Sequence, residues 1–299
     1  MTSFSRLLDT LARVARRGTP GHSAAAQPGA IIKKRDGVDY ISDLLELIDL
    51  PLIRMLEAVD HPGPAFYLRH DVDHDIDMAL AMARAEHRAG YRSTYFLLTP
   101  GSYKEPSNYY GTIEEGKVVH APGLVARCKE LMDLGHEIGL HNDMVSLSFR
   151  VRRPPAELLY EEVEFFARNG IPLQGTAAHG NPLARQLGFN NKELFEGCYR
   201  KDSEPGRVLR HEGWTVALHS LKLQDFGFAY EAYSLPRDSR LSESGSKWGG
   251  RIAGVRPDWE SLNARFDIDA FRSIIRMASA SKGVSHFQVM THPNHWLEK

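Results

Sequence analysis

Cysteine is almost absent from this chain, with only Cys128 and Cys198 among its 299 residues. The two lie far apart and form no Cys-x-x-Cys spacing. This pattern argues against a disulfide framework and is typical of proteins from a reducing compartment. We expect both residues to be buried thiols rather than nucleophiles.

The chain also lacks an excess of charge of either sign and a long apolar run. Its 37 basic and 38 acidic residues give a formal net charge of −1, so no global field attracts nucleic acid or a strongly acidic partner. No uninterrupted apolar run reaches the roughly 18 residues of a membrane-spanning helix. With 42% hydrophobic and 25% charged residues, the composition predicts a soluble globular protein, which we expect in the cytoplasm.

The first 30 residues differ from the rest of the chain. Residues 1–18 carry apolar side chains at helical spacing among four arginines, which predicts a basic amphipathic helix. We expect it to dock on the body of the protein or on a partner; contact with a membrane surface and an organellar transit peptide are the alternatives. Residues 19–30, rich in glycine, proline and small side chains, predict a flexible linker. Residues 31–299 are therefore expected to form one catalytic domain.

Strand and helix patterns alternate along this domain. Short apolar runs predict strands, and amphipathic segments closed by glycine predict helices. Alternation of this length implies a parallel sheet and an α/β fold. The strands are expected at 66–69, 93–98, 136–141, 175–179, 214–219, 226–235 and 286–291, and the helices at 77–89, 124–134, 155–169 and 267–280. Residues 39–59 predict two helices meeting at Pro51, and residues 99–116 predict a loop.

The most informative segment, Leu68 to Asp75, crowds carboxylates and imidazoles at the end of an apolar run. Asp71 and Asp73 are two residues apart, so an extended backbone points both carboxylates to the same side. Like charges held this close share a proton or attract a cation. The alternative is that both aspartates cap the helix that follows, a position that aspartate favours.

Three histidines stand at the ends of other predicted strands: His141, His179 and His292. The carboxyl ends of strands in an α/β barrel meet at one rim, so these histidines are expected to converge with Asp73. A Zn²⁺-like ion requires nitrogen and carboxylate ligands and an open position for water, and two histidines with Asp73 would supply them. Asp71 would then not be a ligand and could act as base toward the metal-bound water. The site then predicts metal-assisted hydrolysis of an acyl bond. The alternative is that the histidines are hydrogen-bonded rim or turn residues.

Three segments resemble the ordered motifs of the polysaccharide deacetylase superfamily (NodB-homology, carbohydrate esterase family 4). They are Arg69–Asp73, Gly135–His141 and Met290–Pro293, and the resemblance spans about residues 64–296. It implies a distorted (β/α) barrel of about seven strands. It also implies a divalent metal, most commonly Zn²⁺, and a deacetylase or related amidohydrolase activity.

The resemblance implies a role for each matching residue. Asp71 is the base, Asp73 and His141 are metal ligands, and His292 is the general acid. The second motif of the family is His-Ser/Thr-x-x-His, but here Val145 stands where the second histidine belongs. His179, located where the family has an Arg-x-Pro motif, is the preferred substitute ligand. The alternative is that metal binding is lost and the barrel is inactive, binding a glycan or a biosynthetic partner.

A looser resemblance exists to an atypical branch found among lipopolysaccharide and O-antigen biosynthesis proteins. It rests on Arg69–Asp73, His179–Pro182, Ser242–Trp248 and His292–Trp296. The implied substrate is an acylated sugar, nucleotide-sugar or lipid-linked saccharide of a surface polysaccharide. The group removed is implied to be an acyl group such as N-acetyl.

Further polar and aromatic residues are predicted to support the site. Trp248, expected in a polar loop, would stack on a pyranose ring; packing in the core or a loop is the alternative, and the more common use of such a residue. Arg240 or Arg251 would hold a carboxylate or phosphate. Asn181, in the polar cluster after the same strand as His179, is the third expected substrate contact. Arg69 is expected to pair with Asp71 if the strand is regular. His70, His74 and His136 are expected to be structural or supporting residues.

Overall fold

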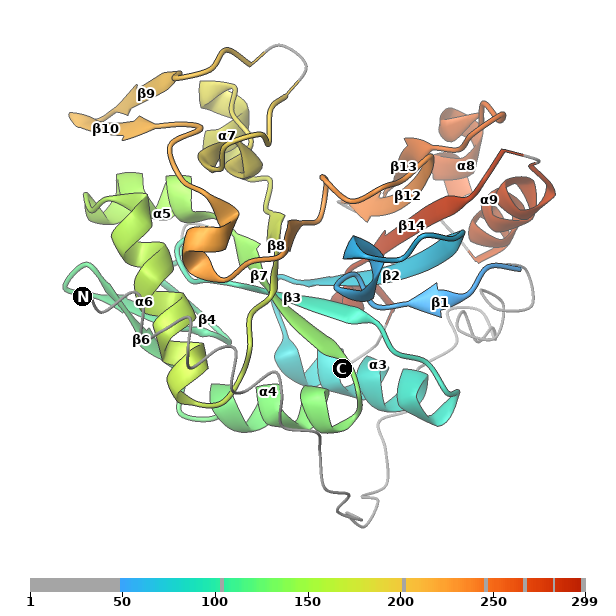
Figure 1. Ribbon diagram of the computed structural model, residues 1–299, viewed down its shortest axis with the longest axis horizontal. Coiled ribbons are helices and arrows are strands. Elements are labelled where there is room, and N and C mark those ends of the chain that lie inside the picture. The colour runs from blue at the N-terminus through green and yellow to red at the C-terminus, as the bar shows by residue number, and fades with distance from the viewer. Residues whose placement is uncertain are drawn as a thin grey trace. The chain divides into compact units, whose positions relative to one another are not determined.

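The structure is a computed structural model that describes residues 49–102, 105–200, 203–244, 247–265, 268–281 and 283–296 (Figure 1). The expected helix at 1–18, the linker at 19–30 and residues 39–48 lie outside these ranges. The chain folds as two compact units. Within the described residues, unit 1 comprises 96–129 and 138–234, and unit 2 comprises 49–95, 130–137 and 235–296.

Unit 2 is built around a fully buried strand, β2 (Ala65–Val72). Burial of every residue is typical of a parallel strand covered on both faces. β2 pairs in parallel with β1 and β14, β14 pairs in parallel with β12, and β12 pairs in antiparallel fashion with β13. The bounds of these partners are Leu52–Ile53 for β1, Ser239–Ser244 for β12, Lys247–Arg251 for β13 and His286–Thr291 for β14.

Helices complete the core of unit 2. Apolar side chains of α3 (Ile76–Arg88) and α9 (Ile268–Ala280) pack with those of β2 and β14 in one hydrophobic cluster. α8 (Trp259–Arg265) packs on β13, and the short α10 (Pro293–Trp296) packs on α3 and β2. These contacts hold the end of β2, and therefore Asp71 and Asp73, in a rigid frame.

Unit 1 carries the strands that end in His141 and before His179. β7 (Glu137–Asn142), β8 (Gly175–Ala178) and β11 (Tyr230–Glu231) pair in parallel. Helices α5 (Met144–Val151), α6 (Pro155–Arg168) and α7 (Pro182–Leu187) accompany them, as does the first part of α4 (Leu124–Asp133), whose residues 130–133 belong to unit 2. Two antiparallel additions consist of β4 (Ser107–Asn108), β5 (Gly111–Glu114) and β6 (Lys117–His120), and of β9 (Val208–His211) and β10 (Trp214–Ala217).

The mixed α/β class is confirmed. The strand order is β11-β8-β7-β3-β2-β14-β12-β13, with β3 at Thr94–Leu98 and β1 paired to β2. Within the described part of the chain, β11 and β13 stand at the two ends of this order and no pairing joins them, so a closed barrel is not shown. Across the same residues, every helix is too short or too polar to cross a membrane.

Several local predictions were wrong, each for a local reason. The strand expected at 226–235 is mostly turns and irregular backbone: η3 (Leu223–Phe226) ends at Gly227, which has φ +74°, and only β11 forms a ladder. In the described part of 39–59, β1 pairs with Phe66 and Tyr67, and η1 (Glu57–Val59) replaces the second helix. The loop expected at 99–116 contains the short strands β4 and β5. Helix α5 was not predicted.

Adjacent glycines in β13 give a matched test of this packing. A methyl group on Gly250, which has φ +148°, would lie 1.9 Å from the carbonyl oxygen of Arg240, whereas one on Gly249 would meet nothing within 4 Å. We expect Gly250→Ala to lower the free energy of unfolding by about 2 kcal/mol or more, because strain and the clash add. Gly249→Ala is expected to change it by less than about 1 kcal/mol. Denaturant unfolding measures both, and equal losses would contradict the strand pairing.

Candidate functional site

Asp71 lies in β2 and forms a buried ion pair with Arg69. The guanidinium donates through Nε to Oδ1 at 2.6 Å and through Nη2 to Oδ2 at 2.8 Å. Both side chains are nearly inaccessible, so this bidentate pair fixes the orientation of the Asp71 carboxylate. The pairing expected from the two-residue spacing is confirmed.

Asp73, just beyond β2, is also buried. The helix that follows is capped by another residue: Asp75 accepts hydrogen bonds from the backbone N–H groups of Asp77 and Met78. The alternative that Asp71 and Asp73 serve as the helix cap is therefore wrong. Two buried carboxylates so close together need positive charge near them.

One source of positive charge in unit 2 is His292, which follows β14. Its Nε2 lies 3.8 Å from Asp73 Oδ2, and its Nδ1 lies 3.4 Å from Glu243 Oε2. Burial alone lowers the pKa of His292, but the hydrogen bond to Glu243 and the negative charges of Asp71, Asp73 and Glu243 outweigh it and raise the pKa to about 9. His292 is therefore protonated at neutral pH.

Glu243, in β12, lies within the Ser242–Trp248 motif, but its sequence position alone did not predict a role for it in the site. Its carboxylate is fully buried, accepts a hydrogen bond from the backbone N–H of His292 at 3.1 Å, and pairs with Nδ1 of His295. Burial raises the pKa of Glu243, but hydrogen bonds from His292 and His295 outweigh this and hold it below its ordinary value. The signal was present in the sequence: Glu243 shares the alternation of the buried Ser239 and Leu241.

Glu243, His292 and His295 also form a group that could hold a metal ion. In this structure the carboxylate and the two Nδ1 atoms face one another as ion pairs. These are the atoms an ion would need as ligands. We therefore interpret this group as an ion-pair cluster in which the Glu243 carboxylate keeps the His292 imidazole protonated.

His141 and His179 belong to unit 1, at the ends of β7 and β8, and both are buried. Nδ1 of His141 faces the carbonyl oxygen of Ala177 at 2.9 Å, and Nδ1 of His179 faces Asp143 Oδ2 at 3.3 Å. An oxygen acceptor requires that Nδ1 carries a hydrogen, and in the neutral ring this places the lone pair on Nε2. Both imidazoles are thus in the tautomer that binds a metal, and their ring centroids lie 4.9 Å apart.

Asp143 stands at the centre of a polar network in unit 1. Burial raises the pKa of Asp143, but the contacts with His179 and the hydrogen bonds from Ser102 and Asn181 outweigh this and hold it below its ordinary value. Val145, where the family has its second histidine, is buried in α5, and its backbone N–H donates to Asn191 at 3.2 Å. The side chain at position 145 therefore packs in the interior of unit 1 and supplies no metal ligand.

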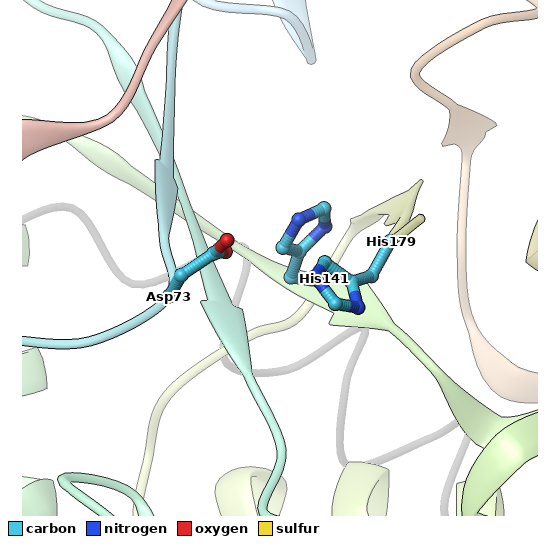
Figure 2. Close-up of side chains that lie close together, drawn as sticks. All are labelled: Asp73, His141 and His179. Carbon is cyan, nitrogen blue, oxygen red and sulfur yellow. The ribbon is translucent and has the colours of Figure 1, made fainter. Parts of the chain in front are cut away.

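Three of the predicted ligands form one group that could hold a metal ion: Asp73, His141 and His179 (Figure 2). Two neutral imidazoles and a carboxylate are the donor set of catalytic zinc sites, so the residues present fit a divalent cation.

Two of the three residues predicted to contact substrate, Trp248 and Asn181, are buried. Trp248 lies in β13 with 3% of its surface exposed and packs in the hydrophobic core, so the prediction of an exposed ring in a polar loop was wrong. Asn181 is buried, caps α7 and donates to Asp143 and Ser146, so its amide serves the scaffold rather than a substrate. Arg240 is half-buried in β12, and its contact with substrate stays a prediction.

The supporting histidines and the cysteines behave largely as expected. Nε2 of His70 pairs with the buried Glu86 at 2.6 Å, and Nε2 of His136 faces the carbonyl oxygen of Ala83 at 3.0 Å, which fits structural roles. His74 is exposed. Both cysteines are buried, and burial raises the thiol pKa to about 12 in Cys128 and about 11 in Cys198. Neither is suited to act as a nucleophile.

Comparison with known proteins assigns the chain to no family. The chain matches no protein-family model, no curated protein and no solved structure. The resemblance to the polysaccharide deacetylase superfamily therefore stays a prediction that rests on the motifs.

The Glu243–His292 pair predicts a pH-dependent stability in the metal-free protein. Because the pKa of His292 is raised, its stabilising effect is fully present below the ordinary value of 6.5 and is lost as the pH rises through about 9. We expect Glu243→Gln to melt below the wild type near neutral pH, with a gap that narrows above pH 9. Thermal unfolding after chelation measures this, and a gap independent of pH would contradict the pairing.

Proposed function

We propose that this protein is a metal-dependent deacetylase that removes an acyl group from a sugar. Asp73, His141 and His179 hold one divalent cation, and the chemistry of these ligands favours Zn²⁺. The observation that carries the proposal is the state of the two imidazoles, whose Nδ1 atoms face oxygen acceptors. In the neutral form of each ring this leaves Nε2 as the atom that can bind a metal.

Asp71 is the general base of the proposed reaction. When bound, a divalent cation in such a site lowers the pKa of a water molecule and polarises the acyl carbonyl. The Asp71 carboxylate takes the proton from the attacking water. An ionised carboxylate accepts about four hydrogen bonds, and Arg69 uses two of them to hold it in place.

His292 is the general acid. Glu243 faces Nδ1 and keeps the imidazole protonated, so the proton on Nε2 is the one available when the carbon–nitrogen bond breaks. Donation of that proton to the departing amine makes it a better leaving group. Asp71 and His292 thus have the opposite protonation states that hydrolysis of an amide requires.

The substrate class rests on the resemblance to surface-polysaccharide biosynthesis proteins. It is an N-acetylated, or otherwise acylated, sugar carried on a nucleotide or a lipid. The rival proposal is an inactive barrel that binds a glycan or a biosynthetic partner, motivated by valine at position 145. Measurement of bound metal and of catalysis separates the two.

The ligand role of Asp73 is tested by metal content. We expect the purified wild-type protein to bind one Zn²⁺ and Asp73→Asn to lose it, because the amide removes the only anionic ligand. Asp77→Asn, which changes an exposed aspartate in the same segment, is the control and should keep the ion. Mass spectrometry of the metal and calorimetric titration of the apoprotein measure this. Metal retained by Asp73→Asn would show that the ligand set is wrong.

The catalytic role of Asp71 is tested by acetate release from a panel of N- and O-acetylated sugars, nucleotide-sugars and lipid-linked saccharides. We expect Asp71→Asn to keep the metal and to lower kcat by about 10²–10⁴-fold, the usual contribution of a general base. A chelator should abolish the wild-type activity, and added Zn²⁺ should restore it. A protein with neither metal nor hydrolysis across the panel would favour the inactive barrel.

A further inference from the structure

Asp143 is a buried carboxylate that the proposed mechanism does not use. It lies between β7 and α5, and 1% of its side chain is exposed. Its oxygens are surrounded by nitrogen atoms of three side chains from later in the chain. They belong to His179, Asn181 and Asn191.

The two asparagines can only donate to Asp143, because backbone groups fix the orientation of each amide. Oδ1 of Asn181 accepts from the N–H of Ala184 at 2.8 Å, and Oδ1 of Asn191 accepts from the N–H of Val145 at 3.2 Å. Their Nδ2 atoms therefore face the carboxylate, at 2.6 Å and 2.7 Å from Oδ1. Nδ2 of Asn181 also lies 2.8 Å from Oδ2.

This arrangement determines the hydrogen on His179. Oδ2 of Asp143 lies 3.3 Å from Nδ1 of His179, and an ionised carboxylate can only accept. Nδ1 must therefore be the donor. In the neutral ring this leaves the lone pair on Nε2, and the backbone carbonyl oxygen of His179 accepts a hydrogen bond from Asn191 at 2.9 Å.

We propose that Asp143 is a positioning residue that sets the tautomer and orientation of His179 for metal binding. This inference rests on the proposed function. It also explains how the proposed site can bind a metal although position 145 is valine and supplies no ligand. The segment after His141 supplies, in place of a second ligand, a carboxylate that prepares His179 to be one.

The isosteric change Asp143→Asn tests this directly. Asn181 and Asn191 both donate toward the Oδ1 position, so the carbonyl oxygen of the new amide would lie there and its NH₂ group would face His179. Nδ1 of His179 must then accept, and the hydrogen moves to Nε2, the atom that would bind the metal. Orientation and tautomer partners of this kind contribute about 10–100-fold to metal affinity.

The experiment compares full-length wild type, Asp143→Asn, His179→Ala and a matched control. The control is Glu162→Gln, which removes another buried carboxylate of unit 1 that bonds a histidine, His120, at 2.9 Å. Zn²⁺ affinity is measured by competition with a chromophoric chelator. We expect about 10–100-fold weaker binding for Asp143→Asn and wild-type binding for Glu162→Gln. Equal losses in the two would overturn the inference, because they would report general destabilisation.

A second measurement needs neither metal nor activity. Nitrogen-15 NMR of the imidazoles in the metal-free protein reports which ring nitrogen carries the hydrogen. We expect Nδ1–H for His179 in the wild type and a shift toward Nε2–H in Asp143→Asn. An Nε2–H tautomer in the wild type would overturn the inference even if the variant failed to fold.

The outcomes separate this inference from the proposed function. A wild type that binds Zn²⁺ and loses it in His179→Ala, while Asp143→Asn binds normally, overturns the role of Asp143 alone. A wild type that binds no Zn²⁺ overturns the proposed function and with it the metal-binding purpose of Asp143. Weakened binding together with the tautomer shift supports both.

Discussion

Burial of carboxylates at the ends of strands is the constraint on which this structure depends. A buried carboxylate without a partner is strongly destabilising, so each one needs a cation or several donors. Asp71 has the guanidinium of Arg69, Glu243 has two histidines, and Asp143 has two asparagines and a histidine. The partners differ, and the differences give each carboxylate its own chemistry.

The group that each histidine faces also differs between His292 and His141, and this determines the chemistry available to each imidazole. His292 faces carboxylates and is held as a cation, whereas Nδ1 of His141 faces an uncharged backbone carbonyl. A protonated imidazole can give a proton but cannot bind a metal, and a neutral one can do the reverse. Environment, rather than residue type, assigns the two roles.

Periodicity and spacing predicted much of the fold, including β2, β14, α3 and α6. These elements form because apolar residues recur at the strand or helix period, which is a local property. The identity of the metal-ligand candidates was also accessible, since each stands where a predicted strand ends. The pairing of Arg69 with Asp71 followed from a separation of two residues, which needs no knowledge of the rest of the chain.

The roles of Trp248, Glu243 and Asp143 could not be predicted in this way. Whether Trp248 is exposed depends on helices about 10 to 30 residues later in the chain, and the partners of Asp143 lie 36 to 48 residues away. The closed barrel expected from the resemblance is not shown, because closure depends on which distant strands pair. Contacts of this range are set by the assembled fold and leave little trace in local sequence.

The cap formed by Asp75 has a consequence for ion selectivity. Asp73 lies between the last residue of β2 and this cap, so the backbone on both sides of it is fixed by hydrogen bonds. A ligand on so short a tether has little conformational entropy to lose on binding, but it also cannot move outward to accommodate a larger ion. In the proposed metal site, a ligand held in this way would favour a small ion at about 2 Å over one such as Ca²⁺ that needs longer contacts and more ligands.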